Sequence, residues 1–137
     1  MIDCRKRVKK LPQIEPHGFI VPGYNLKLSE NVAMTLRFLS GDDAYMPGPL
    51  DVFEADNGAI FLAADRPGLA RVLWVGNYVD EMVSHQAAGI IATIFTLTGL
   101  SEVVPEQAKG AIRAKLDQLK NYATTHVESA IIERVLD

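Results

Sequence analysis

The sequence lacks most of the features that mark common site chemistries. Its 137 residues include a single cysteine, Cys4, which excludes an internal disulfide and fits a reducing compartment. The three histidines, His17, His85 and His126, show no metal-ligand spacing with one another or with Cys4. Neither Gly-x-Gly-x-x-Gly nor the phosphate-cradling Gly-x-x-x-x-Gly-Lys occurs. We therefore predict no metal and no cofactor.

A secretion signal and a long membrane-spanning run are also lacking. No apolar run follows the basic start, so we expect no signal peptide. The uncharged stretch at residues 84–100 is short, and rich in threonine and glycine, for a bilayer span of about 20 apolar residues. We expect a cytoplasmic protein with no membrane partner.

What the chain does have is an uncharged segment that we predict to be its central helix. Residues 84–100 read Ser-His-Gln-Ala-Ala-Gly-Ile-Ile-Ala-Thr-Ile-Phe-Thr-Leu-Thr-Gly-Leu, without a continuous polar stripe. A helix that is apolar on nearly all sides belongs inside a protein. Ser84 is suited to cap its start, and Gly99 is suited to end it in the left-handed conformation.

Two hairpin patterns precede this helix. Asn57-Gly58 stands between two apolar runs, which predicts a tight primed turn with positive φ at both residues. Gly76-Asn77 marks a second compact turn between strands at residues 70–75 and 78–83. We predict an α+β fold: an antiparallel sheet of three or four strands, from two hairpins, packed around the buried central helix, with further amphipathic helices.

Helices are expected on both sides of this core. Ser29 offers a cap for a helix that reaches about Leu39 and ends at Gly41. Pro105 suits the first turn of another helix. The apolar positions of that helix follow a 3.6-residue period and are Ala108, Ile112, Leu116, Leu119 and Ala123.

The two ends of the chain carry weaker signals. Thr125 and Glu128 match a capping box, which predicts a last helix starting near His126. The apolar residues expected to bury that helix are Val127, Ile131 and Val135. Residues 19–21 lie between proline and glycine breakers and could form a short edge strand.

Charge is distributed unevenly along the chain. Residues 1–10 hold five basic side chains and one acidic one, whereas residues 11–137 hold nine basic and sixteen acidic ones. We expect a flexible basic tail at residues 1–10 and a single domain at residues 11–137. A basic tail is able to contact phosphates. The candidate nucleic-acid contacts are Arg5, Lys6, Arg7, Lys9 and Lys10.

No group of residues in the sequence predicts catalysis. Ser84 and His85 are adjacent at a helix start and point in different directions, so capping explains the serine better than nucleophilic attack. Asp80 and Glu81 are neighbours on a predicted strand and face opposite sides, which argues against a shared acid/base pair. Trp74 and Tyr78 flank the second turn, where core packing and an exposed aromatic contact are both open.

Several segments of residues 52–137 resemble the antirestriction family of the ArdB/KlcA type. They are the hairpin at residues 56–62, Gly76-Asn77-Tyr78 followed by Glu81-Met82, the stretch at residues 84–93, and the ending that includes His126-Val127-Glu128. The first third departs from the family pattern, since Met46-Pro47-Gly48-Pro49 replaces a Gly-Gly-aromatic approach to the first hairpin.

The resemblance implies a small cytosolic protein of mobile elements that relieves Type I restriction of incoming DNA. It implies no cofactor and no established catalytic residues, and it implies an antiparallel sheet with surrounding helices. Our hypothesis is a protein-interaction inhibitor, not an enzyme, whose protein target is a Type I restriction enzyme or a DNA-processing complex. The alternative is a nucleic-acid-binding accessory protein that uses the basic N-terminal arm, and a homodimer is left open. The candidate partner contacts lie at the two turns and are Asp56, Asn57, Asn77, Tyr78, Asp80 and Glu81.

Overall fold

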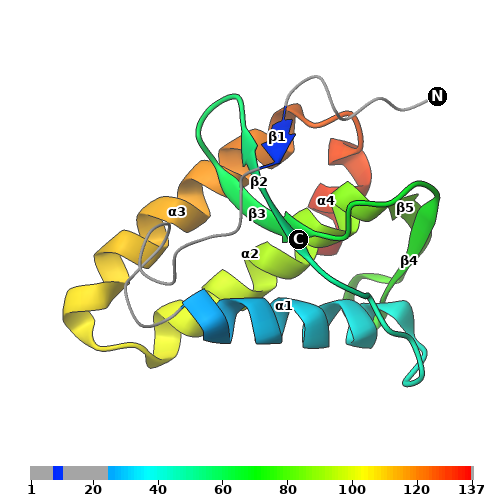
Figure 1. The fold of residues 1–137 in the computed structure, drawn as a ribbon, viewed down its shortest axis with the longest axis horizontal. Coiled ribbons are helices and arrows are strands. Elements are labelled where there is room, and N and C mark those ends of the chain that lie inside the picture. The colour runs from blue at the N-terminus through cyan, green and yellow to red at the C-terminus, as the bar shows by residue number, and fades with distance from the viewer. Residues whose placement is uncertain (1–7, 11–24, 137) are drawn as a thin grey trace.

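The computed structural model describes residues 8–10 and 25–136. Its elements are β1 (Val8–Lys10), α1 (Asn25–Ser40), β2 (Asp51–Ala55), β3 (Ile60–Ala63), β4 (Leu69–Trp74), β5 (Val79–Ser84), α2 (His85–Val103), α3 (Glu106–Thr125) and α4 (Ser129–Leu136). In Figure 1, α2 runs diagonally through the middle of the molecule, with α1 below it and α3 above it. The strand expected at residues 19–21 lies outside the described residues.

The central helix is confirmed. Most residues of α2 are buried, including Ile90, Ile91, Ile94 and Leu97. By length and composition alone α2 could cross a membrane, but here it is the core helix, packed against α1, α3 and both hairpins. The Ser84 hydroxyl accepts a hydrogen bond from the Ala87 amide, as expected of an N-cap.

The predicted end of this helix was wrong. Gly99 lies inside α2, which continues to Val103 because Leu100 and Val104 are buried in the core. Pro105 then stops the helix, since the residue before a proline is pushed into extended conformation, and Val104 has φ −77° and ψ 160°.

The two hairpins are confirmed, and they belong to two sheets. β1, β2 and β3 form one antiparallel sheet, and β4 pairs with β5 in another. The second edge of β3 is covered by α2, where the Thr93 hydroxyl accepts a hydrogen bond from the Leu62 amide at 3.1 Å. β4 does not extend the first sheet at this edge and pairs with β5 alone. The class remains α+β, with hairpins around a central helix.

The first turn has a different geometry from the one expected. Gly58 has φ +85°, but Asn57 does not have positive φ. The Gly58 amide donates to the Ala55 carbonyl, and the Ala55 amide donates to the Ala59 carbonyl. This is a three-residue loop that ends in a left-handed glycine, the other common way to close a hairpin.

The outer helices correct three further expectations. Ser29 lies inside α1, which begins at Asn25, while Gly41 does end that helix with φ +72°. The separate last helix is present but starts later than expected, since α3 extends to Thr125 and α4 begins at Ser129. Val127 is 62% exposed, whereas Val135 is buried and Ile131 partly buried as expected, and Ile132 is buried in addition.

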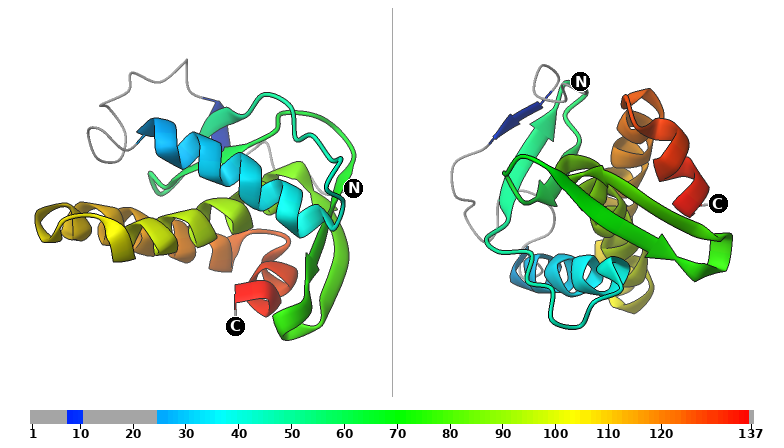
Figure 2. Two further views of the ribbon diagram at one scale, coloured as in Figure 1. Left: turned by 90° about the horizontal axis from the view of Figure 1, so that it is seen from below. Right: turned by 90° about the vertical axis from the view of Figure 1, so that its right-hand side faces the viewer.

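The β4–β5 hairpin stands against one end of the helical layer. Figure 2 shows it crossing the N-terminal end of α2, with its turn projecting beside the end of α4. The β2–β3 hairpin lies farther in, over α2 and α3. The structure therefore offers one projecting hairpin and one enclosed hairpin.

Candidate functional site

The β4–β5 hairpin has one buried and one exposed face. Paired residues share a face in an antiparallel ladder. Val72, Val79 and Val83 lie on the inner face and are fully buried. The opposite face carries Arg71 paired with Met82, and Leu73 paired with Asp80. The exposed outer face and the turn define what we term the hairpin surface: Leu69, Arg71, Val75, Tyr78, Asp80 and Met82.

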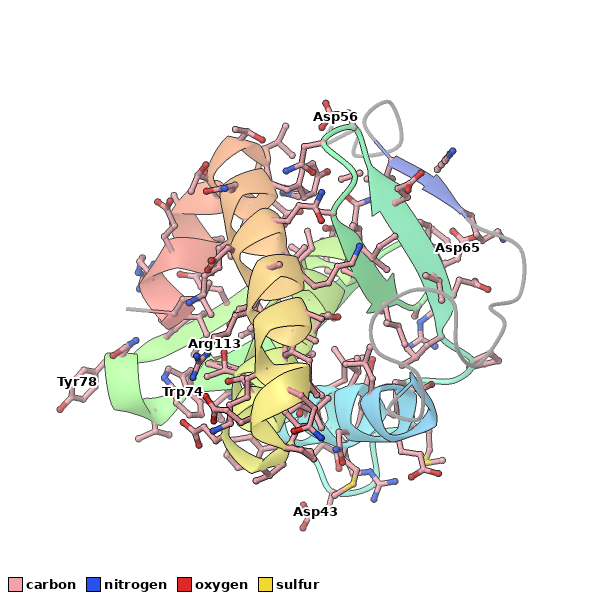
Figure 3. The ribbon with its side chains drawn as sticks, turned by 90° about the vertical axis from the view of Figure 1, so that its left-hand side faces the viewer. Asp43, Asp56, Asp65, Trp74, Tyr78 and Arg113 are labelled. Atoms are coloured by element: carbon pink, nitrogen blue, oxygen red, sulfur yellow. The ribbon has the colours of Figure 1, made fainter. Side chains whose placement is uncertain are left out.

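The turn of this hairpin holds Tyr78 in an unusual conformation. A 3₁₀ turn covers Val75–Asn77, and Tyr78 follows it with φ 55° and ψ 40°. It is the one non-glycine residue with positive φ among those the structure describes. Its side chain is 90% exposed and points away from the molecule in Figure 3. Tyr78 caps the 3₁₀ turn through its amide, which donates to the Val75 carbonyl, but positive φ is uncommon for a bulky residue.

The other aromatic residue of the turn is structural. The Trp74 ring packs on Phe95 with centroids 5.1 Å apart and on Phe38 at 6.1 Å. Of the two alternatives left open for these residues, core packing thus applies to Trp74 and an exposed aromatic side chain to Tyr78. Trp74 anchors the hairpin to α1 and α2, and Tyr78 is presented to solvent.

Helix α4 supports the turn from behind. The Asn77 side-chain amide donates to the carbonyls of Arg134 and Val135, each at 2.9 Å. It therefore satisfies two carbonyls at the end of α4 that have no partner within the helix. Arg134 also forms an ion pair with Glu81 at 3.5 Å. Asn77 and Glu81 face α4, so their side chains fix the hairpin on the body.

The other end of α4 is tied to the start of α2 by a buried polar cluster. The Glu128 carboxylate accepts hydrogen bonds from the Ser84 amide, at 2.9 Å, and from the Ser84 hydroxyl. His126 Nδ1 accepts from the Glu128 amide at 3.0 Å, and its Nε2 lies 2.9 Å from Gln86 Oε1. A carboxylate at a helix N-terminus also interacts favourably with the helix dipole.

The geometry of this cluster favours a structural role. The Ser84 hydroxyl contacts Glu128 and the Ala87 amide, whereas both His126 nitrogens contact other groups. No serine–histidine hydrogen bond of the kind that activates a nucleophile is recorded among residues 8–10 and 25–136. In the same part of the chain, no three His, Cys, Asp or Glu side chains converge as metal ligands.

Sequence reasoning missed this cluster. Glu128 lies three residues after Thr125, so it matched a capping box, but its carboxylate bonds to a residue 44 positions earlier. The spacing of Thr125 and Glu128 was explained by a local capping box, without any long-range contact. The sequence pattern offered no signal for the contact with Ser84.

The charges on the hairpin surface are paired. Arg71 and Asp80 form two hydrogen bonds of 2.8 Å each. The Arg71 guanidinium lowers the pKa of Asp80, and the carboxylate raises the pKa of Arg71. Asp80 and Glu81 face opposite sides of the strand, as expected, and bond to different arginines.

Behind the surface, His85 is buried at the first position of α2. Burial lowers the pKa of its imidazole, and the nearby charge of Arg66 lowers it further. Both effects disfavour the protonated form of His85, which lies next to the hairpin base.

The first turn lies elsewhere. Figure 3 shows Asp56 at the top of the molecule and Tyr78 at its left edge, well apart from each other. Asn57 donates to the Gln118 carbonyl at 3.1 Å, and the Gln118 amide donates back to the Asn57 carbonyl at 2.9 Å. The structure does not bring the two turns into one contact patch, because the first is docked on α3.

The described part of the basic tail is also engaged. Residues 8–10 form β1 at the edge of the first sheet, and so belong to the fold instead of the tail expected at residues 1–10. Lys9 pairs with Glu54 at 3.1 Å and Lys10 with Asp65 at 2.9 Å, which raises the pKa of Lys10. Arg5, Lys6 and Arg7 lie outside the described residues.

Comparison with known proteins identifies the family. Residues 43–137 match the family model of the antirestriction protein. The chain belongs to the antirestriction protein family. Two family members from Escherichia coli, both antirestriction protein KlcA, are 32% identical over 95 residues and 31% identical over 86 residues.

The extent of these matches differs between sequence and structure. The two sequence matches cover 69% and 62% of this chain, and they span 65% and 61% of the relatives. A solved structure matches with a TM-score of 0.79 and 25% identity over 95% of both chains. It comes from work on the KlcA and ArdB proteins, which reports a novel fold and antirestriction activity against Type I DNA restriction systems in vivo but not in vitro. The ArdB/KlcA type suggested by the sequence is confirmed.

Proposed function

We propose that this protein relieves Type I restriction of incoming DNA inside the cell. The observation that carries the proposal is the structural match over 95% of both chains to proteins with that activity in vivo. A match of this extent includes the first third of the chain, where the sequence resemblance is weakest. It supports a shared mode of action through the whole fold.

The proposed mode of action is contact with a protein of the restriction machinery, without bond chemistry. The buried polar cluster contains side chains able to serve acid/base or nucleophilic chemistry, namely those of Ser84, His126 and Glu128. Ser84 is hydrogen-bonded to Glu128, and Glu128 to His126, so these residues join α2 to α4. On the hairpin surface, apolar or aromatic side chains of Leu69, Val75, Tyr78 and Met82 are exposed beside the paired charges of Arg71 and Asp80. We further propose that the protein acts in the cytoplasm and is carried by a mobile element.

Phage plating tests the activity. Unmodified phage is plated on a Type I restricting host with and without the protein, and on a host without the restriction system. We expect expression to raise plating on the restricting host by at least about tenfold. Plating on the restriction-free host should be unchanged.

Two controls make the test decisive. An immunoblot establishes that the protein is expressed, and phage already modified by the host methylase reports any general effect on infection. Unchanged plating of unmodified phage in cells that contain the protein would reject the proposal.

DNA binding through the basic arm receives less support. Lys9 and Lys10 are paired with carboxylates, and phosphate binding would have to break these ion pairs. Binding by phosphate contacts weakens steeply with salt. Retention of DNA by the purified protein at low salt, and its loss at high salt or on replacing Arg5, Lys6 and Arg7 by glutamine, would favour this alternative.

A further inference from the structure

We propose that the hairpin surface is the face that binds the restriction enzyme, and that Tyr78 is its anchor. This inference rests on the proposed function and names the part of the molecule that carries it out. It commits to one occupant, an apolar pocket on a protein subunit of the restriction enzyme.

The first argument is that side-chain packing does not offset the unfavourable backbone conformation of Tyr78. Tyr78 occupies the left-handed region, which glycine and asparagine adopt readily and a tyrosine adopts rarely. Buried aromatic rings gain free energy by packing, but the Tyr78 ring is 90% exposed. The folded protein alone thus gains little from a tyrosine here. Strain of this kind is typical of residues kept for a function.

The second argument is that the neighbouring residues fix the turn that carries Tyr78. Asn77, directly before Tyr78, is fixed by two hydrogen bonds to the end of α4, and Trp74 fixes the strand on the other side of the turn. Figure 3 shows the Tyr78 side chain extending from this braced turn into solvent. A rigid aromatic anchor loses little conformational freedom on binding, which is the reason preorganised surfaces bind well.

The third argument concerns the chemistry of the partner. Leu69 is 56% and Met82 53% exposed at the base of the outer face, where the Arg71–Asp80 ion pair separates them from the exposed residues of the turn. The two arginines of the hairpin and its supporting helix, Arg71 and Arg134, are both paired with carboxylates. A DNA backbone calls for unpaired cations, whereas tyrosine and methionine are enriched where proteins meet. The surface therefore fits a protein with a neutral, apolar pocket.

The test compares stability with activity in two variants. Tyr78→Gly and Tyr78→Asn place residues at position 78 that tolerate its backbone conformation. We expect both to have a Tm equal to or above that of the parent, and to lose at least about tenfold of the restriction relief. Val103→Ala is the matched control, since Val103 is an exposed apolar residue at the far end of α2, and it should retain full relief. Full relief by the Tyr78 variants, or a loss of relief that follows a fall in Tm, would overturn the inference.

Photo-crosslinking identifies the occupant. Benzoylphenylalanine is placed at position 78, or at position 103 as the control, in cells that contain a tagged restriction enzyme. We expect a crosslink to an enzyme subunit from position 78 and none from position 103. A crosslink from position 78 to a second copy of this chain or to DNA would overturn the choice of partner, as would an enzyme crosslink from position 103 alone.

The outcomes separate the two proposals. If the parent protein gives no relief, the proposed function fails and this inference fails with it. If the parent gives relief but position 78 is dispensable, the function stands and only the assignment of the surface is rejected.

Discussion

All four residues of β3 are buried, whereas β5 alternates between buried and exposed positions. The β2–β3 hairpin is enclosed by α2 and α3, and its turn is held by reciprocal hydrogen bonds between Asn57 and Gln118. The β4–β5 hairpin also has its turn fixed to a helix, through Asn77, but it presents its outer face to solvent. Both turns are docked on helices, and only one of them exposes a large aromatic side chain.

The difference lies in what the rest of the chain offers each hairpin. A helix with small residues lets β3 approach its backbone, so the strand becomes part of the core. β4 and β5 bury one face on the helices, and of the outer face Leu73 lies against Gly41 at the end of α1, whereas Leu69, Arg71, Asp80 and Met82 are exposed. Similar local sequence signals therefore lead to one structural hairpin and one that we propose to be functional.

The largest effect is expected where the enclosed hairpin meets α2. A Cβ at Gly89 would lie 2.3 Å from the Leu62 carbonyl oxygen and 2.4 Å from the Ala63 Cβ. Gly89→Ala should therefore force backbone atoms apart and lower the free energy of unfolding by about 3 kcal/mol. Urea unfolding followed by circular dichroism measures the change.

Gly99→Ala is the matched control on the same helix. A Cβ at Gly99 meets nothing within 4 Å, and alanine favours a helix over glycine by up to about 1 kcal/mol. We expect this variant to be as stable as the parent or more so. Equal unfolding free energies for the two variants would contradict the close approach of β3 to α2.

The next largest effect concerns the base of the exposed hairpin. Glu128→Ala removes the acceptor of the Ser84 amide and hydroxyl, and it should lower the free energy of unfolding by about 2–3 kcal/mol. Glu133 is an exposed residue of α4, so Glu133→Ala should change stability by no more than about 0.5 kcal/mol. Thermal unfolding of both variants checks the prediction. A loss no larger for Glu128→Ala than for Glu133→Ala would be evidence against the cluster.

The sequence predicted those parts of the fold that depend on local pattern. The uncharged stretch predicted a buried helix, Ser84 predicted its cap, and the Asn57-Gly58 and Gly76-Asn77 pairs predicted both hairpins. These features follow from hydrophobic periodicity and turn chemistry within a few residues. Helix ends were less predictable, because burial of Leu100 and Val104 outweighed the preference of Gly99 for a helix terminus.

Features that depend on distant contacts were not predictable. Thr93 covers the edge of β3 at Leu62. Predicting this contact from the sequence would require knowing that residues 62 and 93 lie side by side. The candidate contacts at the two turns were chosen from turn chemistry alone. The structure divides them, since Asn57 and Asn77 bind helices and Tyr78 faces solvent.

A paired substitution sharpens the comparison of the two turns. Asn57→Ala and Asn77→Ala each remove side-chain hydrogen bonds that dock a turn on a helix, so each should cost about 1 kcal/mol of stability. Only Asn77→Ala should also reduce restriction relief, because it loosens the turn that holds Tyr78. Phage plating and thermal unfolding are measured together. Equal relief by both variants would mean that the position of the exposed turn does not affect activity.

The smallest effect is expected at His85, which lies where the chain enters α2 between the two hairpins. Burial and the charge of Arg66 lower the pKa of this imidazole in the folded state. In the unfolded chain its pKa is about 6.5, so the unfolded state binds more protons below that pH. The contribution of neutral His85 to stability is therefore complete above about pH 6.5 and is lost as the pH falls toward the lowered folded value. The slope cannot exceed about 1.4 kcal/mol per pH unit for one group. The glutamine of His85→Gln stays neutral over this pH range. The urea midpoint of the variant should therefore fall less than that of the parent between pH 7.5 and 5.5. His126 is present in both proteins, so any effect of that residue cancels in the difference. Parallel pH profiles would show that Arg66 and burial leave the charge state of His85 unchanged on folding.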